Sequence, residues 1–426
     1  MPLMQDIEDI IKFKLMLDFI EITLIQQCEK NPKVYRGAGS IFQDNKGHIQ
    51  LKMYVKDFSQ FTDLPKHNSR VLVEDSNLFY LEATDTTGIK WKAKYLHLKR
   101  GNIITAEIFN LEQIYEHSEN FKELKAQFYI LGKYDFPFNE YKVTEYESSL
   151  TICKFKTDYF DCEIDQHDKY MDVFILTKES NDFNLLIDLI IEALSIITGH
   201  YLQPLIKMTE SKNIQLLELY SHRLKQDEKK LNPPISTHVF DKIEDLKEFI
   251  HCYVTKFKEK RSHFFKSWYR NFLESQGLYI NQALVLTVSI EGILKEYFSD
   301  TTPVDNTAKI STLEEIEKIS IDETIFNDIK NYLTKPKEPN LQKRLKKLVK
   351  DDVISEDLFK ICLEIRNYSA HADKIVMDSK KTNMQKIIYE IDACLELFYL
   401  LLFYYIGYKG RHIEYSNNAK FDRSAQ

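Results

Sequence analysis

The chain has 426 residues, of which 43% are hydrophobic and 13% aromatic. This length exceeds what one hydrophobic core usually serves, and we expect two domains. The apolar content excludes a wholly disordered or fibrous protein. Lys and Arg number 58 against 65 Asp and Glu, and the net charge of −7 argues against a protein that coats nucleic acid over its whole surface. Any contact with nucleic acid must therefore be local.

The six cysteines are scattered without a CxxC pair or another metal-type spacing. This predicts neither a disulfide framework nor a zinc site, and it fits a reducing cytoplasm. The first residues carry acids before their apolar stretch, so they lack the basic region of a secretion signal. The apolar segment 395–408 holds Glu396 and is shorter than the roughly 20 residues that a membrane span needs. We therefore expect a cytoplasmic protein with no membrane contact.

We interpret residues 1–30 as an N-terminal helical segment and residues 31–180 as a β-rich domain. In the second segment, short apolar stretches are separated by polar turns. Residues 48–55 alternate between polar and apolar side chains, which is typical of a half-buried antiparallel strand. The turns at 44–47 and 85–88 supply Asp, Asn and Gly, the residues that hairpin loops need. The pattern predicts an antiparallel, sandwich-like arrangement.

From residue 181 onward, apolar residues recur three and four positions apart and glycine becomes rare. We expect a helical connector over 181–276, a helical bundle over 277–410 and a tail over 411–426. Within the bundle the pattern predicts four helices, near 280–298, 312–333, 355–372 and 383–408. The sequence thus predicts the α+β class, with a β-rich domain followed by an all-α region that ends in a four-helix bundle.

The sequence contains no phosphate-binding loop, dinucleotide-binding glycine motif, zinc-protease motif or serine-hydrolase motif. One chemically capable pattern remains, Arg366-Asn367 followed by three residues and His371. Asn367 and His371 share a helix face, and the long side chain of Arg366 can turn toward the same place. RNA cleavage needs a base for the 2′-hydroxyl proton and a cation for the charge that develops on the phosphate, and His and Arg supply both. Arg and His at this spacing also occur by chance on solvated helices.

The motif, its place on the penultimate helix and the preceding helix with Ala283 to Leu294 resemble a HEPN domain. The β-rich first half, which opens near Tyr35 to Phe42 and is followed by helices, is similar to the ApeA-type abortive-infection proteins of bacteria. Active HEPN members are metal-independent endoribonucleases that act as dimers, with both Arg/His motifs facing one cleft. The resemblance therefore implies a HEPN four-helix bundle, Arg366, Asn367 and His371 as catalytic residues, no cofactor, and a homodimer formed through the bundle.

Glu291 is a further candidate catalytic residue, because it lies in an otherwise apolar helix, where an unpaired carboxylate is costly. The carboxylate can face the catalytic cleft. It can equally form a structural ion pair with a bundle partner, Arg366 included. The sequence supports the two interpretations equally.

Two basic stretches are candidates for RNA binding. Residues 335–350 carry seven Lys and Arg against one Glu and run into the motif helix. The preferred RNA-binding residues are Lys343, Arg344, Lys346, Lys347 and Lys350. Residues 256–270 mix basic and aromatic side chains that can stack on bases, but aromatic residues at helical spacing more often belong to a core. The histidines and acidic runs show no ligand-like spacing, so no metal site is expected.

These observations lead to the hypothesis of a bacterial anti-phage toxin whose C-terminal bundle cleaves RNA, tRNA included, after attack of the 2′-hydroxyl. By analogy with the family, the N-terminal domain senses a phage-derived activator or restrains the nuclease. The alternative is a non-catalytic HEPN scaffold for dimerisation or partner binding, in which Arg366 and His371 make structural hydrogen bonds. A third class, a carbohydrate- or peptide-binding β-sandwich on a helical scaffold, requires exposed aromatic residues that converge on the N-terminal domain.

Overall fold

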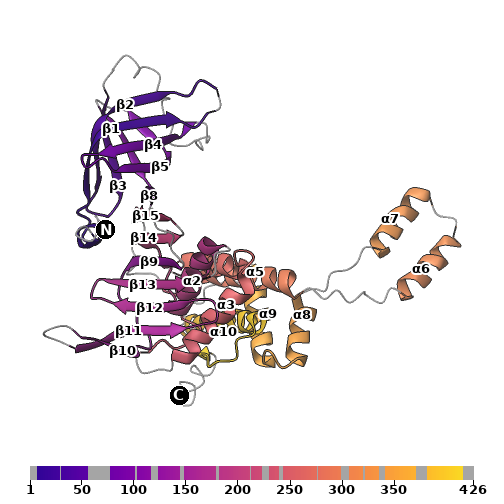
Figure 1. The fold of residues 1–426 in the computed structure, drawn as a ribbon. Helices are drawn as coiled ribbons and strands as arrows, with labels where there is room; N and C mark the ends of the chain where they lie inside the picture. Colours follow the sequence, from indigo (N-terminus) through magenta and orange to yellow (C-terminus); the bar gives the residue numbers. More distant parts are fainter. Residues whose placement is uncertain are drawn as a thin grey trace. The chain divides into compact units, whose positions relative to one another are not determined.

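A computed structural model describes residues 7–28, 30–55, 77–100, 103–116, 123–143, 148–178, 182–211, 213–222, 230–238, 243–275, 277–298, 307–319, 322–334, 341–370 and 381–415. An antiparallel sheet precedes a helical region, which confirms the predicted α+β class. The chain divides into two compact units, Met1–Arg261 and Ser262–Gln426 (Figure 1). Of the expected tail, residues 416–426 lie outside the described residues.

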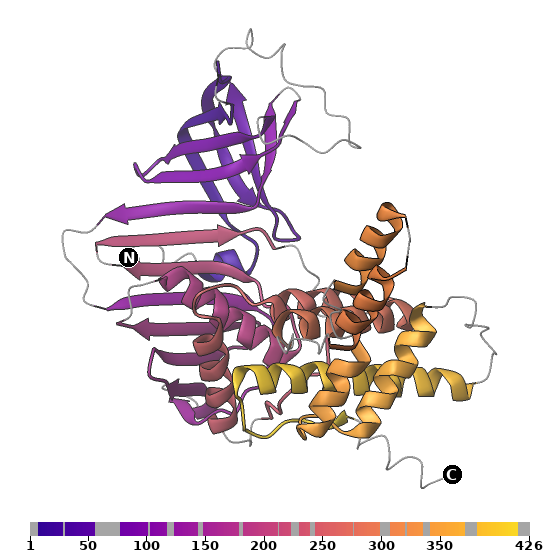
Figure 2. The same ribbon diagram turned by 90° about the vertical axis from the view of Figure 1, so that its right-hand side faces the viewer.

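The N-terminal unit is built on one continuous sheet, in which every described pair of neighbouring strands is antiparallel. Figure 2 shows the magenta strands of this sheet lying one beside the next. The order is β10-β11-β12-β13-β9-β14-β15-β8-β5-β4-β1-β2-β3-β7-β6. The strands are β1 (Met16–Gln26), β2 (Val34–Gln43), β3 (Ile49–Val55), β4 (Phe79–Asp85), β5 (Lys90–Leu96), β6 (Leu98–Arg100), β7 (Ile104–Ile108), β8 (Asn110–Glu116), β9 (Leu124–Leu131), β10 (Glu140–Val143), β11 (Ser148–Lys156), β12 (Asp161–Gln166), β13 (Tyr170–Thr177), β14 (Pro204–Ser211) and β15 (Ile214–Tyr220).

The expected sandwich is therefore replaced by a single sheet, and the hairpin of β14 and β15 is the reason. β14 pairs with β9 on one side, and β15 pairs with β8 on the other, so the hairpin joins two groups of strands that would otherwise be separate. The strands β1 to β5 and β7 enclose a core that includes Phe19, Tyr35, Leu81 and Trp91. Buried side chains alternate along β3 and β4, as the sequence of 48–55 predicts.

The described residues of the expected N-terminal helical segment, 7–28 and 30, contain more strand than helix, which corrects the expectation from the sequence. The helix α1 spans only Ile7–Ile11, and the strand β1 follows it. A bulge between Phe19 and Ile22 shifts the register of β1 against β2, and these two buried side chains are three positions apart instead of two. A spacing of three is typical of a helix face, so the bulge concealed the alternation of this strand in the sequence.

The segment 181–276 is not wholly helical either. It begins with α2 (Phe183–Thr198), continues with β14 and β15, and ends with α3 (Ile243–Phe257) and α4 (His263–Glu274). In β15, Leu217, Glu218 and Leu219 are all buried, as is usual for an interior strand with both faces covered. An apolar run without alternation does not distinguish a buried strand from a helix, and this explains the error.

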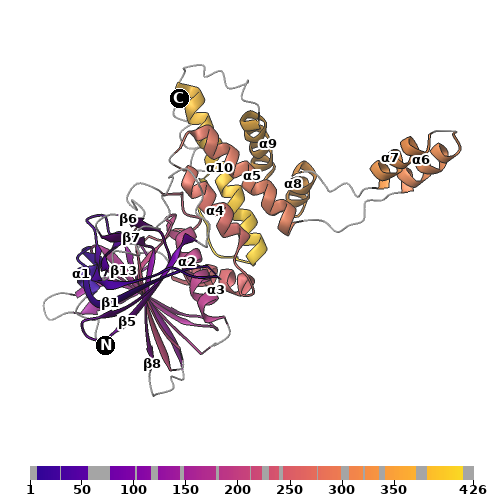
Figure 3. The ribbon, with the colours of Figure 1, turned by 90° about the horizontal axis from the view of Figure 1, so that it is seen from above.

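The boundary between the two units lies after Arg261, inside the expected connector, and not at residue 180 or 276. Figure 3 shows α2 and α3 side by side, and the contacts place α3 against both α2 and β11. His251 of α3 stacks on Tyr159 with 5.6 Å between ring centroids. Gly199 ends α2 with φ 71°, and a Cβ there would lie 2.0 Å from the carbonyl oxygen of Leu231. These contacts make α2 and α3 part of the N-terminal unit.

The C-terminal unit is a helical bundle. The helices α4, α5 (Tyr279–Tyr297), α9 (Glu356–Ala370) and α10 (Lys381–Ile406) pack against one another, and α8 (Leu341–Lys350) lies against α5 and α9 (Figure 3). Phe264 and Trp268 of α4 and Phe398 of α10 are fully buried. The aromatic residues at 264 and 268 are therefore core residues, which confirms the interpretation that the sequence favours for the second basic stretch.

The bundle does not use the four helices that the sequence predicts. In place of one helix near 312–333 there are two, α6 (Thr307–Glu317) and α7 (Glu323–Thr334), which pack on each other. The fourth place in the bundle is taken by α4. Its Phe264, Trp268 and Phe272 recur every four residues and are buried, whereas Ile325 of α7 is 54% exposed.

The long helix α10 contains most of the apolar segment 395–408. Glu396 within that segment is buried in the bundle. Across the described parts of the chain, no helix combines the length and the apolar character needed to cross a membrane.

Candidate functional site

The Arg366 motif lies near the C-terminal end of α9. Leu358, Cys362 and Ile365 recur at helical spacing, and all three are buried against the bundle. The next two residues, Arg366 and Asn367, are respectively half-exposed and exposed. The spacing of the buried face therefore directs these two side chains out of the core. His371, the third residue of the motif, lies outside the described residues.

The guanidinium of Arg366 contacts the carboxylate of Glu291 on α5. Nε and Nη2 of Arg366 both donate to Oε2 of Glu291, each at 3.4 Å. The side chains of Arg366 and Glu291 are 42% and 47% exposed. The sequence left two interpretations of Glu291 open, and the structure has the one in which Glu291 forms an ion pair with Arg366. Because the carboxylate is exposed, it does not bear the burial cost that the apolar neighbours of Glu291 suggest.

Four of the five basic residues expected to bind RNA are exposed on α8: Lys343, Lys346, Lys347 and Lys350. Arg344 is 8% exposed, and its Nη1 donates to the carbonyl oxygen of Leu294 at 2.6 Å. That carbonyl lies in the last turn of α5 and also accepts from the backbone N–H of Phe298 at 3.2 Å, so Arg344 supplies its second hydrogen bond. Arg344 therefore has a structural role inside the bundle, and the structure corrects the expectation that its guanidinium binds RNA.

α5 contacts both the buried side of α8 and the Arg366 end of α9. Glu291 of α5 contacts Arg366, and Leu294 of α5 receives the hydrogen bond from Arg344. Three residues of helix rise about 4.5 Å, so the two contacts are less than one turn apart. α8, which carries the exposed lysines, therefore packs on α5 within one turn of the contact with Arg366.

Lys386 of α10 is a charged neighbour of α9 that no sequence motif indicated. Its Nζ lies 4.0 Å from a carboxylate oxygen of Glu364 and 3.3 Å from one of Glu390. Glu390 is buried, and burial raises its pKa. The spacing of four between Lys386 and Glu390 predicts their pairing on one helix. Only the fold shows that this pair adjoins α9, where Glu364 lies two residues before Arg366.

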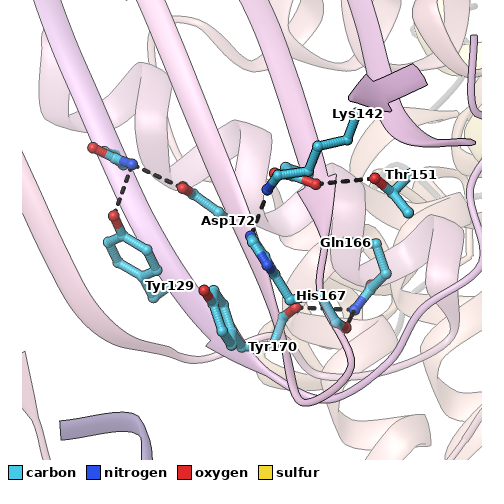
Figure 4. Close-up of polar contacts among 9 residues, drawn as sticks. Tyr129, Lys142, Thr151, Gln166, His167, Tyr170 and Asp172 are labelled. Atoms are coloured by element: carbon cyan, nitrogen blue, oxygen red, sulfur yellow. Dashed lines mark hydrogen bonds and ion pairs between the residues drawn. The ribbon is translucent and has the colours of Figure 1, made fainter. Parts of the chain in front are cut away.

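A second group of polar side chains lies on the sheet of the N-terminal unit (Figure 4). Asp172 of β13 and Tyr129 of β9 are direct cross-strand partners. Nε2 of Gln127 donates to Oδ2 of Asp172 and to the hydroxyl oxygen of Tyr129, both at 2.8 Å. The other carboxylate oxygen of Asp172, Oδ1, is buried and has no hydrogen-bond partner among the described residues. Burial raises the pKa of Asp172 from 3.8 to about 6.

Charged partners surround Asp165 on the neighbouring strand β12 (Figure 4). Asp165 forms an ion pair with Lys142, and Nε2 of His167 lies 3.4 Å from Oδ2 of the same carboxylate. The ring of His167 stacks on Tyr170 with 4.2 Å between centroids. Burial lowers the pKa of His167, against the opposing charge of Asp165. The members of this group come from several strands and turns, and no sequence motif joins them.

Within the described parts of the chain, no three His, Cys, Asp or Glu side chains are placed to hold a metal ion. No protein-family model matches the sequence, and neither curated proteins nor solved structures give a match. The function must therefore be argued from the chemistry of the residues themselves.

Proposed function

We propose that the protein is a metal-independent endoribonuclease of the HEPN type, which cleaves RNA after attack of the 2′-hydroxyl on the adjacent phosphate. The observation that carries this proposal is the surface position of Arg366 and Asn367 on α9, a helix against which α8 with its exposed lysines packs. A guanidinium presents two parallel N–H donors that match two phosphate oxygens. Arg366 thus holds the scissile phosphate, and Asn367 orients the phosphate or a catalytic partner.

His371 supplies the proton chemistry in this proposal. It acts as the base for the 2′-hydroxyl or as the acid for the leaving oxygen, because an imidazole titrates near working pH. One imidazole cannot accept and donate a proton in the same step. In a symmetric dimer the partner subunit's His371 provides the second function, and the dimer is therefore part of the mechanism.

The outer face of α5 supports dimerisation at this place. Leu284 and Val288 are 42% and 56% exposed on it. Gly292 lies on the next turn, and among the described residues outside its own helix backbone no heavy atom lies within 4 Å of where its Cβ would stand. A glycine inside a helix costs about 1 kcal/mol relative to alanine. Nothing in this open space within one chain explains why a glycine stands here in place of an alanine. A second α5 that approaches closely does explain it, because a Cβ would keep the two helices apart. A two-fold contact there also brings both copies of Arg366 near each other.

The N-terminal unit has the regulatory role in the proposal. An unrestrained ribonuclease in the cytoplasm would damage its own cell, so a restraint is required. By analogy with ApeA-type proteins, we assign the restraint to the N-terminal unit, together with the sensing of a phage component that releases it. The protein is then an anti-phage toxin that acts in abortive infection.

The decisive experiment measures cleavage of total cellular RNA, tRNA included, in EDTA by the wild-type protein, Arg366→Gln and His371→Ala. His412→Ala, a change of an exposed histidine elsewhere in the C-terminal unit, is the matched control. We expect the wild type and the control to cut and to leave 5′-hydroxyl ends, and the two motif variants not to cut. A wild type that is inactive alone is tested again with lysate from phage-infected cells. Cleavage that requires a metal ion, or that persists in His371→Ala, contradicts the proposed site.

The alternative function, a non-catalytic scaffold, is favoured by the contact of Arg366 with Glu291 inside one chain. In that case the ion pair serves the bundle alone, and Arg366→Gln lowers stability without changing any reaction on RNA. Both side chains are more than 40% exposed, however. A pair this exposed contributes about 0–1 kcal/mol. Stability is therefore a weak reason for an arginine at this position.

A further inference from the structure

The contact with Glu291 occupies the edge of Arg366 that a phosphate would use. Nε and Nη2 are the two donors on one side of the guanidinium, and both converge on the single oxygen Oε2 of Glu291. Each distance is 3.4 Å, longer than the roughly 2.7–2.9 Å that is usual between a guanidinium and an oxyanion. A phosphate that presents two oxygens can satisfy the same two donors separately and at shorter range.

We propose that Glu291 is a placeholder anion: it engages Arg366 while the site is empty, and an RNA phosphate displaces it. This inference rests on the ribonuclease function proposed above. It gives Glu291 a role that is neither catalytic nor purely structural, because the carboxylate competes with the substrate for the guanidinium. Removal of the carboxylate then improves substrate binding, whereas removal of a catalytic carboxylate impairs turnover.

The surroundings of the pair allow this exchange. Arg366 and Glu291 are 42% and 47% exposed, so a ligand can reach the guanidinium without opening the core. Lys295 lies four residues after Glu291 on the exposed face of α5, the spacing at which a Glu and a Lys pair on a helix. The displaced carboxylate therefore has a cation within reach.

The size of the effect follows from the exposure of the pair. An exposed ion pair contributes up to about 1 kcal/mol, and its loss on RNA binding therefore weakens the affinity up to about fivefold. A competitor of this strength does not prevent RNA binding. Small solutes with a lone carboxylate or phosphate bind Arg366 without also contacting the exposed lysines of α8, as RNA does. Competition from Glu291 therefore lowers the occupancy of Arg366 by such solutes.

The test is a comparison of RNA affinity between Glu291→Gln and Glu364→Gln, measured by fluorescence anisotropy with a labelled RNA in the His371→Ala background, which prevents cleavage. Glu364 is the matched control, because it is a similarly exposed carboxylate near Arg366 that forms its ion pair with Lys386. We expect Glu291→Gln to bind RNA about three to five times more tightly, and Glu364→Gln to gain clearly less. In the Arg366→Gln background the gain from Glu291→Gln should vanish, because the carboxylate then has no guanidinium to occupy.

Turnover gives the second readout. With His371 restored, Glu291→Gln should lower KM and leave kcat within about twofold. A fall in kcat, weaker RNA binding, or a gain that persists in the Arg366→Gln background overturns the placeholder role. If Arg366→Gln weakens RNA binding while Glu291→Gln gives no gain, only the placeholder role fails. If Arg366→Gln leaves RNA binding and cleavage unchanged, the ribonuclease site fails as well, and the two failures are thus distinguishable.

Discussion

Replacement of Asp172 by Asn should remove a pH-dependent loss of stability from the N-terminal unit. Burial raises the pKa of Asp172 from 3.8 to about 6, against smaller opposing effects of the hydrogen bond from Gln127 and the charge of Lys142. Because the pKa is raised, the folded state holds the proton more tightly than the unfolded state does. The resulting stabilisation is complete below pH 3.8 and is lost as the pH rises to about 6.

The magnitude follows from the two pKa values. The difference between about 6 and 3.8 is about 2.2 pH units, and at about 1.36 kcal/mol per unit it corresponds to about 3 kcal/mol. The amide that Asp172→Asn introduces carries no charge at any pH. Between about pH 4 and about pH 7.5, Asp172→Asn should therefore become more stable relative to the wild type. The difference between their unfolding free energies should grow by up to about 3 kcal/mol. At the lower pH the two proteins should be nearly equal in stability.

Urea denaturation of the full chain provides the assay. The chain has two tryptophans, Trp91 in the N-terminal unit and Trp268 in the C-terminal unit. In a Trp268→Phe background, the fluorescence of Trp91 reports the unfolding of the N-terminal unit. Asp168→Asn, an exposed change on the turn after β12, controls for the loss of one negative charge. If the stability difference between wild type and Asp172→Asn is the same at both pH values, the pKa of Asp172 is not raised. That result means that the charge of Asp172 is compensated in the fold.

Three further predictions concern the helices. Arg344→Met should destabilise the bundle by about 1.5–3 kcal/mol in urea denaturation followed through Trp268, because the carbonyl of Leu294 loses its charged donor, whereas Lys346→Met should change stability by less than about 0.5 kcal/mol. Gly199→Ala should destabilise the N-terminal unit by more than about 1 kcal/mol, measured through Trp91, because φ is 71° and the new Cβ meets a backbone oxygen. Gly292→Ala should stabilise the monomer by up to about 1 kcal/mol and weaken self-association in sedimentation equilibrium, and stronger association would contradict the proposed close approach.

The fold was predictable where a segment follows one simple period, and not where the period is interrupted. The alternation over 48–55 indicated β3 because that strand has one buried face and no bulge. β1 was missed because its bulge spaces Phe19 and Ile22 like a helix. β15 was missed because an interior strand shows no alternation. In both strands the deciding information is the pairing with distant strands, which no local pattern contains.

The candidate sites differ in the same way. Arg366 and Asn367 could be proposed from the sequence because the chemistry of the motif is local to one helix. The role of Glu291 was left open between two interpretations, since Glu291 lies on a different helix and its exposure depends on how α5 packs. The group around Asp172 was not found, because its members come from several strands and share no spacing in the sequence. Arg344 was assigned to the surface although Leu341, Leu345 and Leu348 mark its side of α8 as the buried one.

Arg344 and Arg366 show why the number of basic residues on a helix is a poor guide to ligand binding. Both guanidiniums contact α5, within one turn of each other. Arg344 is buried on a backbone carbonyl that also accepts from the N–H of Phe298, and withdrawing the guanidinium breaks a charged hydrogen bond at a cost of about 1.5–3 kcal/mol. Arg366 meets an exposed carboxylate, and releasing it costs about 0–1 kcal/mol. Of these two arginines, only Arg366 can exchange its partner for a phosphate at low cost. What qualifies a basic residue for the site is therefore the small cost of leaving its present partner, and that cost is set by burial.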